Sequence, residues 1–248
     1  MPVTQALFRD DAYLAEADAV VVAVNNEGGI VLNRTIFYAT SGGQPGDTGS
    51  LTREDGTVVP IATTITGEAK EDIIHVPAEG ALALAVGDSV HLAIDMERRL
   101  KLMRMHTACH LLTTFCQFPV TGAAVSVDDS RVDFDMQGET ITKEEATEKL
   151  MALVRADHPV FIRMISEDEL AANPSLVKSK NVGPPTGTGQ IRLVCIGENA
   201  SIDSQPCGGT HVRSTGEIGE MHIGKIEKKG RENRRLRLRF GPLEGAGL

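Results

Sequence analysis

Cysteine is scarce in this sequence of 248 residues, and its four positions are scattered: Cys109, Cys116, Cys195 and Cys207. So few thiols exclude a disulfide framework, and we expect each cysteine to be reduced, as a core residue or a metal ligand. No stretch approaches the roughly 18 consecutive apolar residues of a membrane span. The N-terminus carries acidic residues where a signal peptide needs a basic start and an apolar run. These absences predict a cytoplasmic protein without a membrane segment.

Basic charge is scarce in the first third of the chain. Residues 1–90 contain 4 Lys/Arg against 13 Asp/Glu, whereas residues 91–248 contain 21 of each, so the first part accounts for the net charge of −9. The acidic total argues against a nucleic-acid partner, but a local basic patch is the feature that binds phosphate. Residues 225–239 form such a patch, with 8 basic residues against two acidic ones. The alternative interpretation is a strand with a solvated basic face.

The shift in charge predicts a domain boundary near residues 87–95. Short runs rich in Val, Ile and Thr, separated by Gly, Asp, Asn and Pro, fill the preceding part, which suggests a small β-barrel. After the boundary, helical and strand patterns mix. We therefore predict an α+β fold, with a β-barrel domain at 1–92 and an α+β domain at 93–248.

The second domain is expected to begin with its longest helix. Apolar residues recur at helical spacing over 95–117, a range without glycine or proline. A second helix is predicted over 142–156, where Thr142 and Glu145 form a capping box, and Ser166 should cap a shorter third helix. Residues 173–190, rich in Pro, Gly and Ser, indicate a long loop that is either a plain connection or a lid.

Two pairs of potential metal ligands stand far apart in the sequence. His106 and His110 are four residues apart on the predicted helix, which places both imidazoles on one face. Cys207 and His211 lie in the motif CGGTH, whose glycines permit a tight turn between them. Either pair alone is a weak signal, but histidine and cysteine suit zinc, and the two pairs together predict one Zn²⁺ site. The other three cysteines are expected in the core.

Several motifs in order resemble one family. TIFYATSGGQPGDTG, MRMHTACHLL, SRVDFDM, SIDSQPCGGTHV and KIEKKGRENRRLRL are similar to the editing domain of alanyl-tRNA synthetases and to its free-standing relatives, the AlaX proteins. The two ligand pairs alone would also fit the editing domain of threonyl-tRNA synthetases. The glycine-rich loop and the leading β domain resemble the medium-sized AlaX type instead.

The resemblance implies a deacylase that acts in trans on mischarged tRNA(Ala), with Ser-tRNA(Ala) as substrate and Gly-tRNA(Ala) as a further one. Gln44, on the glycine-rich loop, is our candidate for recognising the serine hydroxyl or positioning a water, because its amide both donates and accepts. Thr107 and Asp203, which flank metal ligands, are further candidates for the catalytic site, where they could support the ligands; either could equally be a cap or a turn former. Contacts to substrate or tRNA are expected from Gly42, Gly43, Arg98, Arg104, Lys228, Lys229, Arg234 and Arg235.

Three alternatives stay open at this point. Four protein ligands normally describe a structural zinc site, so the chain could be a non-catalytic tRNA-binding module. The tRNA could also differ, with Ser-tRNA(Thr) as the substrate. A zinc hydrolase for another small ester would leave the basic segment without a purpose.

Overall fold

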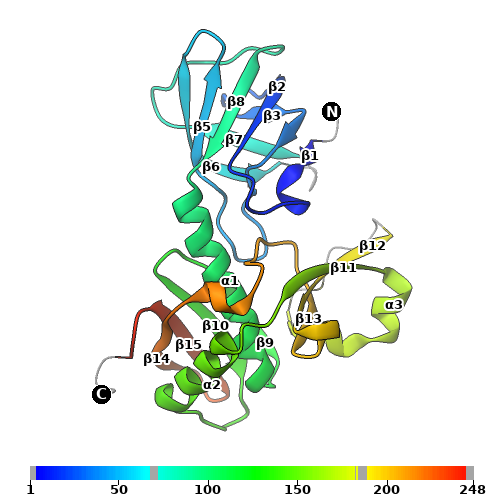
Figure 1. Cartoon of the computed structure of the whole chain (residues 1–248), viewed down its shortest axis with the longest axis vertical. Coiled ribbons are helices and arrows are strands. Elements are labelled where there is room, and N and C mark those ends of the chain that lie inside the picture. The colour runs from blue at the N-terminus through cyan, green and yellow to red at the C-terminus, as the bar shows by residue number, and fades with distance from the viewer. Residues whose placement is uncertain (1–3, 68–71, 182, 184–188, 244–248) are drawn as a thin grey trace. The chain divides into compact units, whose positions relative to one another are not determined.

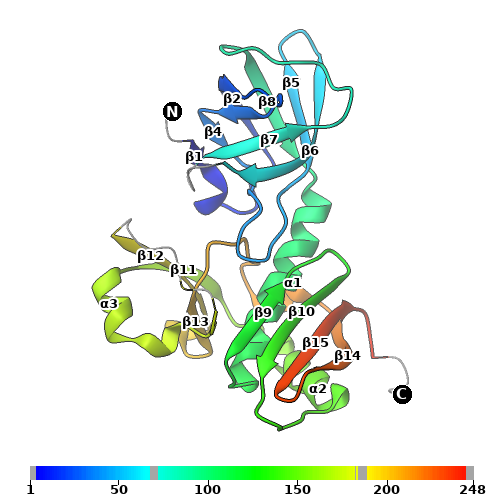
Figure 2. The same ribbon diagram turned by 180° about the vertical axis from the view of Figure 1, so that it is seen from behind.

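The computed structural model describes residues 4–67, 72–181, 183 and 189–243, and the chain divides into two compact units, Met1–Leu100 and Lys101–Leu248 (Figures 1 and 2). The division between these units falls inside helix α1 (Met96–Phe115). This division does not test the boundaries of the two functional domains that the sequence predicts, 1–92 and 93–248, and they stay a prediction. None of the helices in the described ranges combines the length and the apolar character needed to cross a membrane.

The first unit is a closed barrel of six antiparallel strands, which confirms the predicted barrel. Along β6, Val59 and Ile61 are buried while Val58 and Pro60 are exposed, the alternation expected of a strand with one face in a core. The barrel order is β2 (Glu16–Val24), β3 (Ile30–Leu32), β7 (Ile73–Pro77), β6 (Val58–Thr66), β5 (Gly49–Arg53) and β8 (Ser89–Ile94). A parallel pair, β1 (Gln5–Ala6) and β4 (Arg34–Thr35), and the short helix η1 (Leu7–Arg9) complete the unit.

A buried histidine links three segments of the barrel. His75 Nδ1 lies 3.0 Å from the carbonyl oxygen of Ile30, which can only accept, so Nδ1 carries the proton. His75 Nε2 then accepts from the Thr35 hydroxyl at 2.7 Å, and Thr35 Oγ1 accepts from the backbone N–H of Phe37. Burial lowers the pKa of His75 to about 4. The histidine is therefore neutral, in one fixed tautomer.

A buried ion pair fixes the base of the glycine-rich loop. Arg99, in the first turn of α1, is fully buried and donates to the carboxylate of Asp47. Its other N–H groups donate to the carbonyl oxygens of Ala12 and Ile36, each at 2.7 Å. Asp47 also accepts from the backbone N–H of Tyr38. Because both charges are satisfied by hydrogen bonds, the pair can exist away from water.

Close backbone packing fixes the same loop one residue earlier. A Cβ atom on Gly46 would lie 1.9 Å from the carbonyl oxygen of Thr64, so only glycine fits there. The Gly46 carbonyl oxygen accepts from Arg98 at 2.8 Å. The loop between Tyr38 and Gly49 is thus tied to its surroundings by backbone and side-chain contacts.

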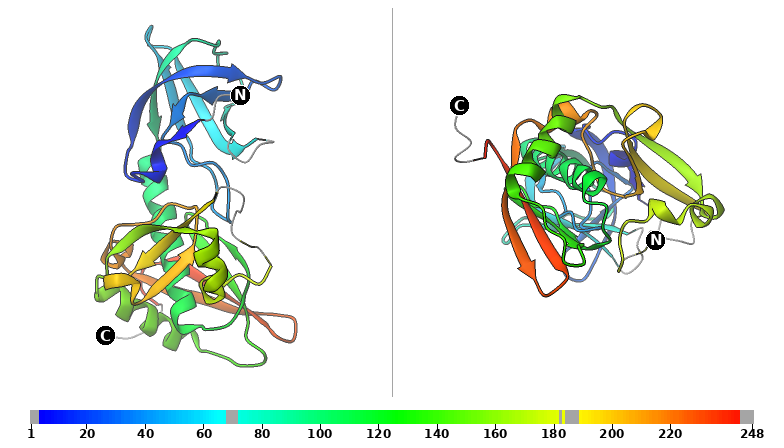
Figure 3. Two further views of the ribbon diagram at one scale, coloured as in Figure 1. Left: turned by 90° about the vertical axis from the view of Figure 1, so that its right-hand side faces the viewer. Right: turned by 90° about the horizontal axis from the view of Figure 1, so that it is seen from below.

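Among its described residues, the second unit contains two antiparallel sheets, most of α1 and two further α-helices, the α+β mixture that the sequence predicted. The four-stranded sheet has the order β14 (Met221–Lys229), β15 (Asn233–Phe240), β10 (Asp129–Asp135) and β9 (Val120–Ala124). The three-stranded sheet has the order β11 (Val160–Ser166), β12 (Gln190–Ile196) and β13 (Asp203–Pro206). Helix α2 (Lys143–Arg155) packs across β14 (Figure 3). The remaining elements are α3 (Glu167–Ala172) and the short helices η2 (Pro174–Leu176), η3 (Glu198–Ala200) and η4 (Thr215–Ile218).

The helices begin where the sequence places them. Thr142 caps α2 by accepting from the N–H of Glu145 at 3.1 Å, and Ser166 caps α3 by accepting from Glu169 at 3.0 Å. Helix α1 is buried around most of its circumference, with Leu102, Met103 and Met105 all inaccessible to solvent. Helix α1 is therefore surrounded by other parts of the fold and is not a surface helix.

The predicted loop 173–190 lies partly outside the described residues. In its described part, residues 174–176 form η2 and Ser179 bridges to Val120 beside β9. The backbone of Val120 exchanges hydrogen bonds with Lys178 and Lys180. This part of the segment is anchored to the edge of the four-stranded sheet, and a lid role stays a prediction.

The buried His75 predicts a pH-dependent stability. Its pKa is about 4 in the folded protein, below the ordinary value near 6.5, so between these values the unfolded chain binds a proton that the folded chain excludes. The free energy of unfolding should therefore fall as pH falls from about 6.5 to about 4, by up to about 3 kcal/mol.

Urea denaturation at several pH values tests this in the wild type and in His75→Gln, whose amide can keep one donor and one acceptor. As pH falls, the free energy of unfolding should decrease more in the wild type than in His75→Gln. A difference that is the same at pH 7 and pH 4.5 would contradict the prediction.

Candidate metal centre

Four side chains from two distant segments meet at one point in the second unit. Helix α1 supplies His106 and His110, and the segment after β13 supplies Cys207 and His211. One ligand atom of each lies within 4.8 Å of the other three. The sulfur of Cys207 is 3.5 Å from His106 Nε2 and 3.4 Å from His211 Nε2. This group could hold a metal ion.

The directions of the pKa shifts of Cys207 and His211 suit metal binding. Burial raises the pKa of the Cys207 thiol, but His106 and His211 outweigh that effect and hold this pKa well below its usual value. Burial, together with the charge of His106, holds the pKa of His211 well below its usual value as well. A thiolate and a neutral imidazole are the forms that coordinate metal ions.

Thr107 fixes the tautomer of one ligand. Its hydroxyl donates to the carbonyl oxygen of Met103, one turn earlier in α1, at 2.9 Å. With its proton used in this way, Thr107 Oγ1 accepts from His211 Nδ1 at 3.1 Å and from the N–H of Val212 at 3.3 Å. His211 is thereby protonated at Nδ1, and its Nε2 lone pair faces Cys207 and the cluster.

Asp203 supports a second ligand. Its Oδ2 lies 3.4 Å from His110 Nδ1, although the two atoms do not meet hydrogen-bond geometry. Burial lowers the pKa of His110, but Asp203 and Cys207 outweigh this and raise it to about 9. A carboxylate behind a histidine makes the opposite ring nitrogen a better metal ligand. Thr107 and Asp203 thus contact ligands, and direct catalysis by either residue stays a prediction.

The carboxylate of Asp203 is itself held by groups that the sequence did not reveal. Lys178 donates to Asp203 Oδ1, and Gln205 donates to Oδ2 at 2.7 Å. Both also donate to the hydroxyl of Thr113, which donates to the backbone of His110. Lys178 comes from the predicted loop, so no spacing in the sequence linked it to this site.

Arg192 holds the loop that carries Cys207. Its guanidinium donates to the carbonyl oxygens of Cys207 at 2.6 Å and Gly209 at 3.1 Å, and Gly209 N–H lies 3.4 Å from the Cys207 sulfur. Neither glycine of CGGTH has a positive φ, so this cradle, rather than a left-handed backbone, shapes the turn. The signal for this role in the sequence is a lone arginine in the otherwise apolar strand IRLVCIG.

The other cysteines lie in the core, as expected. Cys109, Cys116 and Cys195 are free and buried. Burial raises the pKa of Cys109 to about 12 and that of Cys116 to about 11. A raised pKa keeps the thiols of Cys109 and Cys116 protonated at neutral pH, which makes these two residues poor metal ligands.

Gln44, the predicted catalytic amide, belongs to the first unit. Its backbone exchanges hydrogen bonds with that of Ser41, and its side chain is fully buried. Gly42 and Gly43 precede it with φ values of 56° and 83°, so both need the freedom of glycine. The roles predicted for these three residues in substrate recognition stay predictions.

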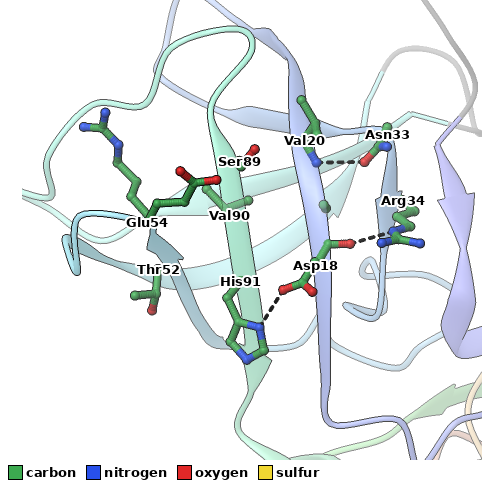
Figure 4. Close-up of a pocket in the computed structure, with 11 residues that line it drawn as sticks. Asp18, Val20, Asn33, Arg34, Thr52, Glu54, Ser89, Val90 and His91 are labelled. Carbon is green, nitrogen blue, oxygen red and sulfur yellow. Dashed lines mark hydrogen bonds and ion pairs between the residues drawn. The ribbon is translucent and has the colours of Figure 1, made fainter.

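An open pocket of about 460 Å³ lies on the barrel, and none of the candidate site residues from the sequence lines it (Figure 4). His91 and Asp18 interact there at 2.8 Å, and Val20 donates to the side chain of Asn33. Both pairs are exposed and internally satisfied. Among the described residues, the lining of this pocket contains no group of potential metal ligands like the cluster.

Much of the basic segment is neutralised within the four-stranded sheet. Arg235 donates two hydrogen bonds to Asp133, at 2.7 and 2.8 Å. Lys229 lies 3.4 Å from Glu227. Arg234, in contrast, donates to backbone carbonyl oxygens, and Lys228 is exposed.

Arg104 takes part in the packing of the unit. Its Nε donates to the carbonyl oxygen of Ile218 at 2.7 Å, and its guanidinium lies 4.5 Å from the ring centroid of Phe240. Arg98 donates to Gly46, as described above. Contacts from these arginines to tRNA stay predictions.

The cluster predicts that the purified protein contains about one metal ion per chain. Replacing Cys207 by serine should lower both the metal content and the thermal midpoint, because an incomplete ligand set binds metal less tightly. Elemental analysis after preparation without chelators measures this, with Cys195→Ser as the matched control, since that cysteine is buried but is not a ligand. Equal metal content in wild type and Cys207→Ser would contradict the prediction.

Comparisons with known families agree with both parts of the chain. Residues 191–237 match the family model described as the threonyl and alanyl tRNA synthetase second additional domain, which covers the strand of Arg192 and the CGGTH ligands. Residues 5–98 match the model described as tRNA synthetases class II (A), which covers the barrel.

Individual relatives extend the match to nearly the whole chain. The alanyl-tRNA editing protein AlaX-M of Methanosarcina acetivorans is 36% identical over 241 residues, 94% of this chain and 97% of the relative. AlaX-M of Saccharolobus solfataricus is 31% identical over 237 residues, with the same two coverages. An alanine–tRNA ligase of Pyrobaculum calidifontis is 33% identical over 92% of this chain, but over only 26% of the ligase. With a match along almost its full length, and a group of side chains in its second unit that could hold a metal ion, the chain belongs to the family of alanyl-tRNA editing proteins of the AlaX-M type.

Proposed function

We propose that this protein hydrolyses the ester bond of Ser-tRNA(Ala), and of Gly-tRNA(Ala) as a further substrate, and thereby corrects errors of alanyl-tRNA synthetase in the cytoplasm. The observation that carries this proposal is the buried cluster of three histidines and a cysteine in a chain of the AlaX-M family. The relatives are named for alanyl-tRNA editing, which supports tRNA(Ala) as the tRNA.

Zinc is the metal that we propose for the cluster. Three imidazoles and one thiolate suit zinc, and the low pKa of Cys207 favours the ligand form of the thiol. His106, His110, Cys207 and His211 would hold the ion. Zinc supplies Lewis acidity, which can polarise an ester carbonyl or lower the pKa of water.

The surrounding residues orient these ligands instead of transferring protons. The hydroxyl proton of Thr107 is directed to Met103, and its lone pairs are taken by His211 and Val212. Asp203 is buried between His110, Lys178 and Gln205. Neither has a group to spare for general acid–base work, so we assign both of them a positioning role.

The need for a second site follows from the size of the amino acids. A synthetase pocket for a small apolar side chain cannot strongly reject an analogue that adds a hydroxyl, so a hydrolytic site must remove the error. Such a site can select serine and reject alanine if its polar groups form hydrogen bonds with the serine hydroxyl. Alanine lacks the hydroxyl and would leave those groups unpaired. Gln44 remains our candidate for this recognition, on the resemblance of its loop to the family.

A second candidate function is a non-catalytic tRNA-binding module with a structural metal. Four protein ligands favour it, because catalytic zinc sites usually keep one position open. Catalysis by the purified protein separates the two candidates.

The proposed activity is tested with tRNA(Ala) charged with serine, glycine or alanine, and with Ser-tRNA(Thr). We expect Ser-tRNA(Ala) to be hydrolysed fastest and correctly charged Ala-tRNA(Ala) to be spared. Removal of the metal with a chelator should abolish hydrolysis, and added zinc should restore it. Binding of the tRNAs without hydrolysis would instead establish the non-catalytic module.

The salt dependence of tRNA affinity tests the basic segment. Lys228 and Arg234 lie directly opposite each other in the β14–β15 hairpin, and neither relies on an acidic partner among the described contacts. Replacing both by glutamine should flatten the slope of log K against log salt by about 0.7 to 0.9 per lost phosphate contact.

Arg235→Gln is the control for this pair, because Asp133 already neutralises Arg235 and its loss should change the slope little. Parallel lines for wild type and the Lys228/Arg234 double variant would show that the phosphate-binding surface lies elsewhere.

A further inference from the structure

The register of the three-stranded sheet aligns the metal centre with an exposed strand. Cys207 follows β13 and donates its N–H to the carbonyl oxygen of Arg192 at 3.1 Å, which continues the β12–β13 ladder by one residue. Arg192 in turn pairs with Met164 on β11. Residues directly opposite in antiparallel strands share a face. Met164, Arg192 and Cys207 therefore form one row across the sheet.

Two further rows lie on the same face. Ile162, Val194 and Gln205 form the second, and Val160, Ile196 and Asp203 form the third. Asp203 and Gln205 support His110, so the β13 end of every row belongs to the metal centre.

The opposite face of the sheet belongs to a separate core. Ile165, Leu193 and Cys195, which alternate with the residues of the three rows, cluster with Leu170 of α3. Helix α3 packs on β11 and β12 from that side (Figure 1). The face with the three rows is thus distinct from the face that α3 covers.

Burial on this face falls sharply from the middle strand, β12, to the outer strand, β11. Val194 and Ile196 in the middle strand are fully buried. On β11, the outer strand, Ile162 is 40% exposed and Met164 is 51% exposed. Two large apolar side chains thus stand open to solvent, about two strand spacings, or ~10 Å, from Cys207.

We propose that Ile162 and Met164 form the surface that binds the base of the 3′-terminal adenosine of the aminoacyl-tRNA. This inference rests on the proposed function and adds a binding subsite to it. The ester to be hydrolysed is attached to the ribose of that nucleotide, so when the ester is at the metal centre the base lies within one nucleoside of it. A nucleobase offers an apolar face and binds to apolar or planar side chains irrespective of sequence.

The charges on this face are compatible with a nucleotide. Asp203 is the sole carboxylate in the three rows, and Lys178 neutralises it. Arg192, in the middle of its row, is positively charged and held in place by the carbonyl oxygens of Cys207 and Gly209. A phosphate or a base at Met164 would therefore meet a fixed cation and no free acid.

Kinetics of Ser-tRNA(Ala) hydrolysis provide the first test. Met164→Ser, Ile162→Ser and the double variant should raise KM by about 5- to 20-fold, with kcat changed less than about twofold, because the base is bound equally in ground and transition states. Phe161→Ser is the matched control, since Phe161 is 38% exposed on the same strand but faces the α3 side, opposite Cys195. Metal content and thermal midpoint should be unchanged in all the variants on the metal-centre face. A wild-type KM in the double variant would overturn the proposal.

Direct binding provides a test that does not depend on activity. With ¹³C-methyl methionine, the signal absent from the Met164→Ser spectrum identifies the Met164 methyl group among the eight methionines. Adenosine 5′-monophosphate should shift that signal, whereas ribose 5-phosphate, which lacks the base, should not. If ribose 5-phosphate produces the same shift, or millimolar adenosine 5′-monophosphate produces none, the base does not bind there.

These outcomes separate the inference from the proposed function. A shift of Met164 in a protein without deacylase activity would refute the function and retain the subsite. Full deacylase activity, with an unchanged KM in the double variant and no shift of the Met164 signal, would retain the function and refute the subsite. A second copy of this chain is the competing occupant of the strand, and a dimer in sedimentation that Met164→Ser dissociates would overturn the subsite.

Discussion

The structure of the second unit depends on one constraint: three imidazoles and a thiolate, from segments about a hundred residues apart, must reach a single buried point. Each ligand is directed by a different neighbour. Thr107 sets the tautomer of His211, Asp203 faces His110, and Arg192 shapes the loop of Cys207. Ligand atoms held in this way need little rearrangement to bind an ion. Most of the entropy of ordering the site is therefore lost when the chain folds, and little is lost when the ion binds.

This organisation also explains why the polar residues around the cluster are poor candidates for proton transfer. Thr107 has its proton and lone pairs engaged, and Asp203 is surrounded by donors. Groups that fix ligands must be satisfied themselves, because an unpaired polar group in a buried position is costly. The contacts of Thr107 and Asp203 therefore agree with the positioning role that we propose for both residues.

The sequence revealed the parts of this site that have a fixed local spacing. His106 and His110 are one helical turn apart, and the caps at Thr142 and Ser166 follow from short motifs, so local physics was enough. Lys178, Arg192 and Met164 were missed because their roles depend on which strands pair and in which register. The basic segment shows the same limit: the arginines are visible in the sequence, but Asp133, about a hundred residues earlier, is brought to Arg235 only by the fold. The predicted barrel was recoverable because turn residues punctuate its strands, whereas the burial of Gln44 depends on contacts that no pattern encodes.

The pairing of charges across β10, β15 and β14 has a consequence for the response to heat. Asp129 and Glu227 connect Arg237 and Arg239 into one network, and Asp133 forms a second pair with the neighbouring Arg235. Isolated surface pairs add little to stability, but the cost of stripping water from charges falls as temperature rises, so networks gain weight in hot conditions. On warming, the ion pairs between these strands keep their strength, whereas purely apolar contacts gain nothing further. The backbone amides of this sheet are therefore expected to be among the last to exchange with solvent. Arg235, Arg237 and Arg239, which belong to the basic segment of the sequence, thus also link the strands of this sheet in the folded chain.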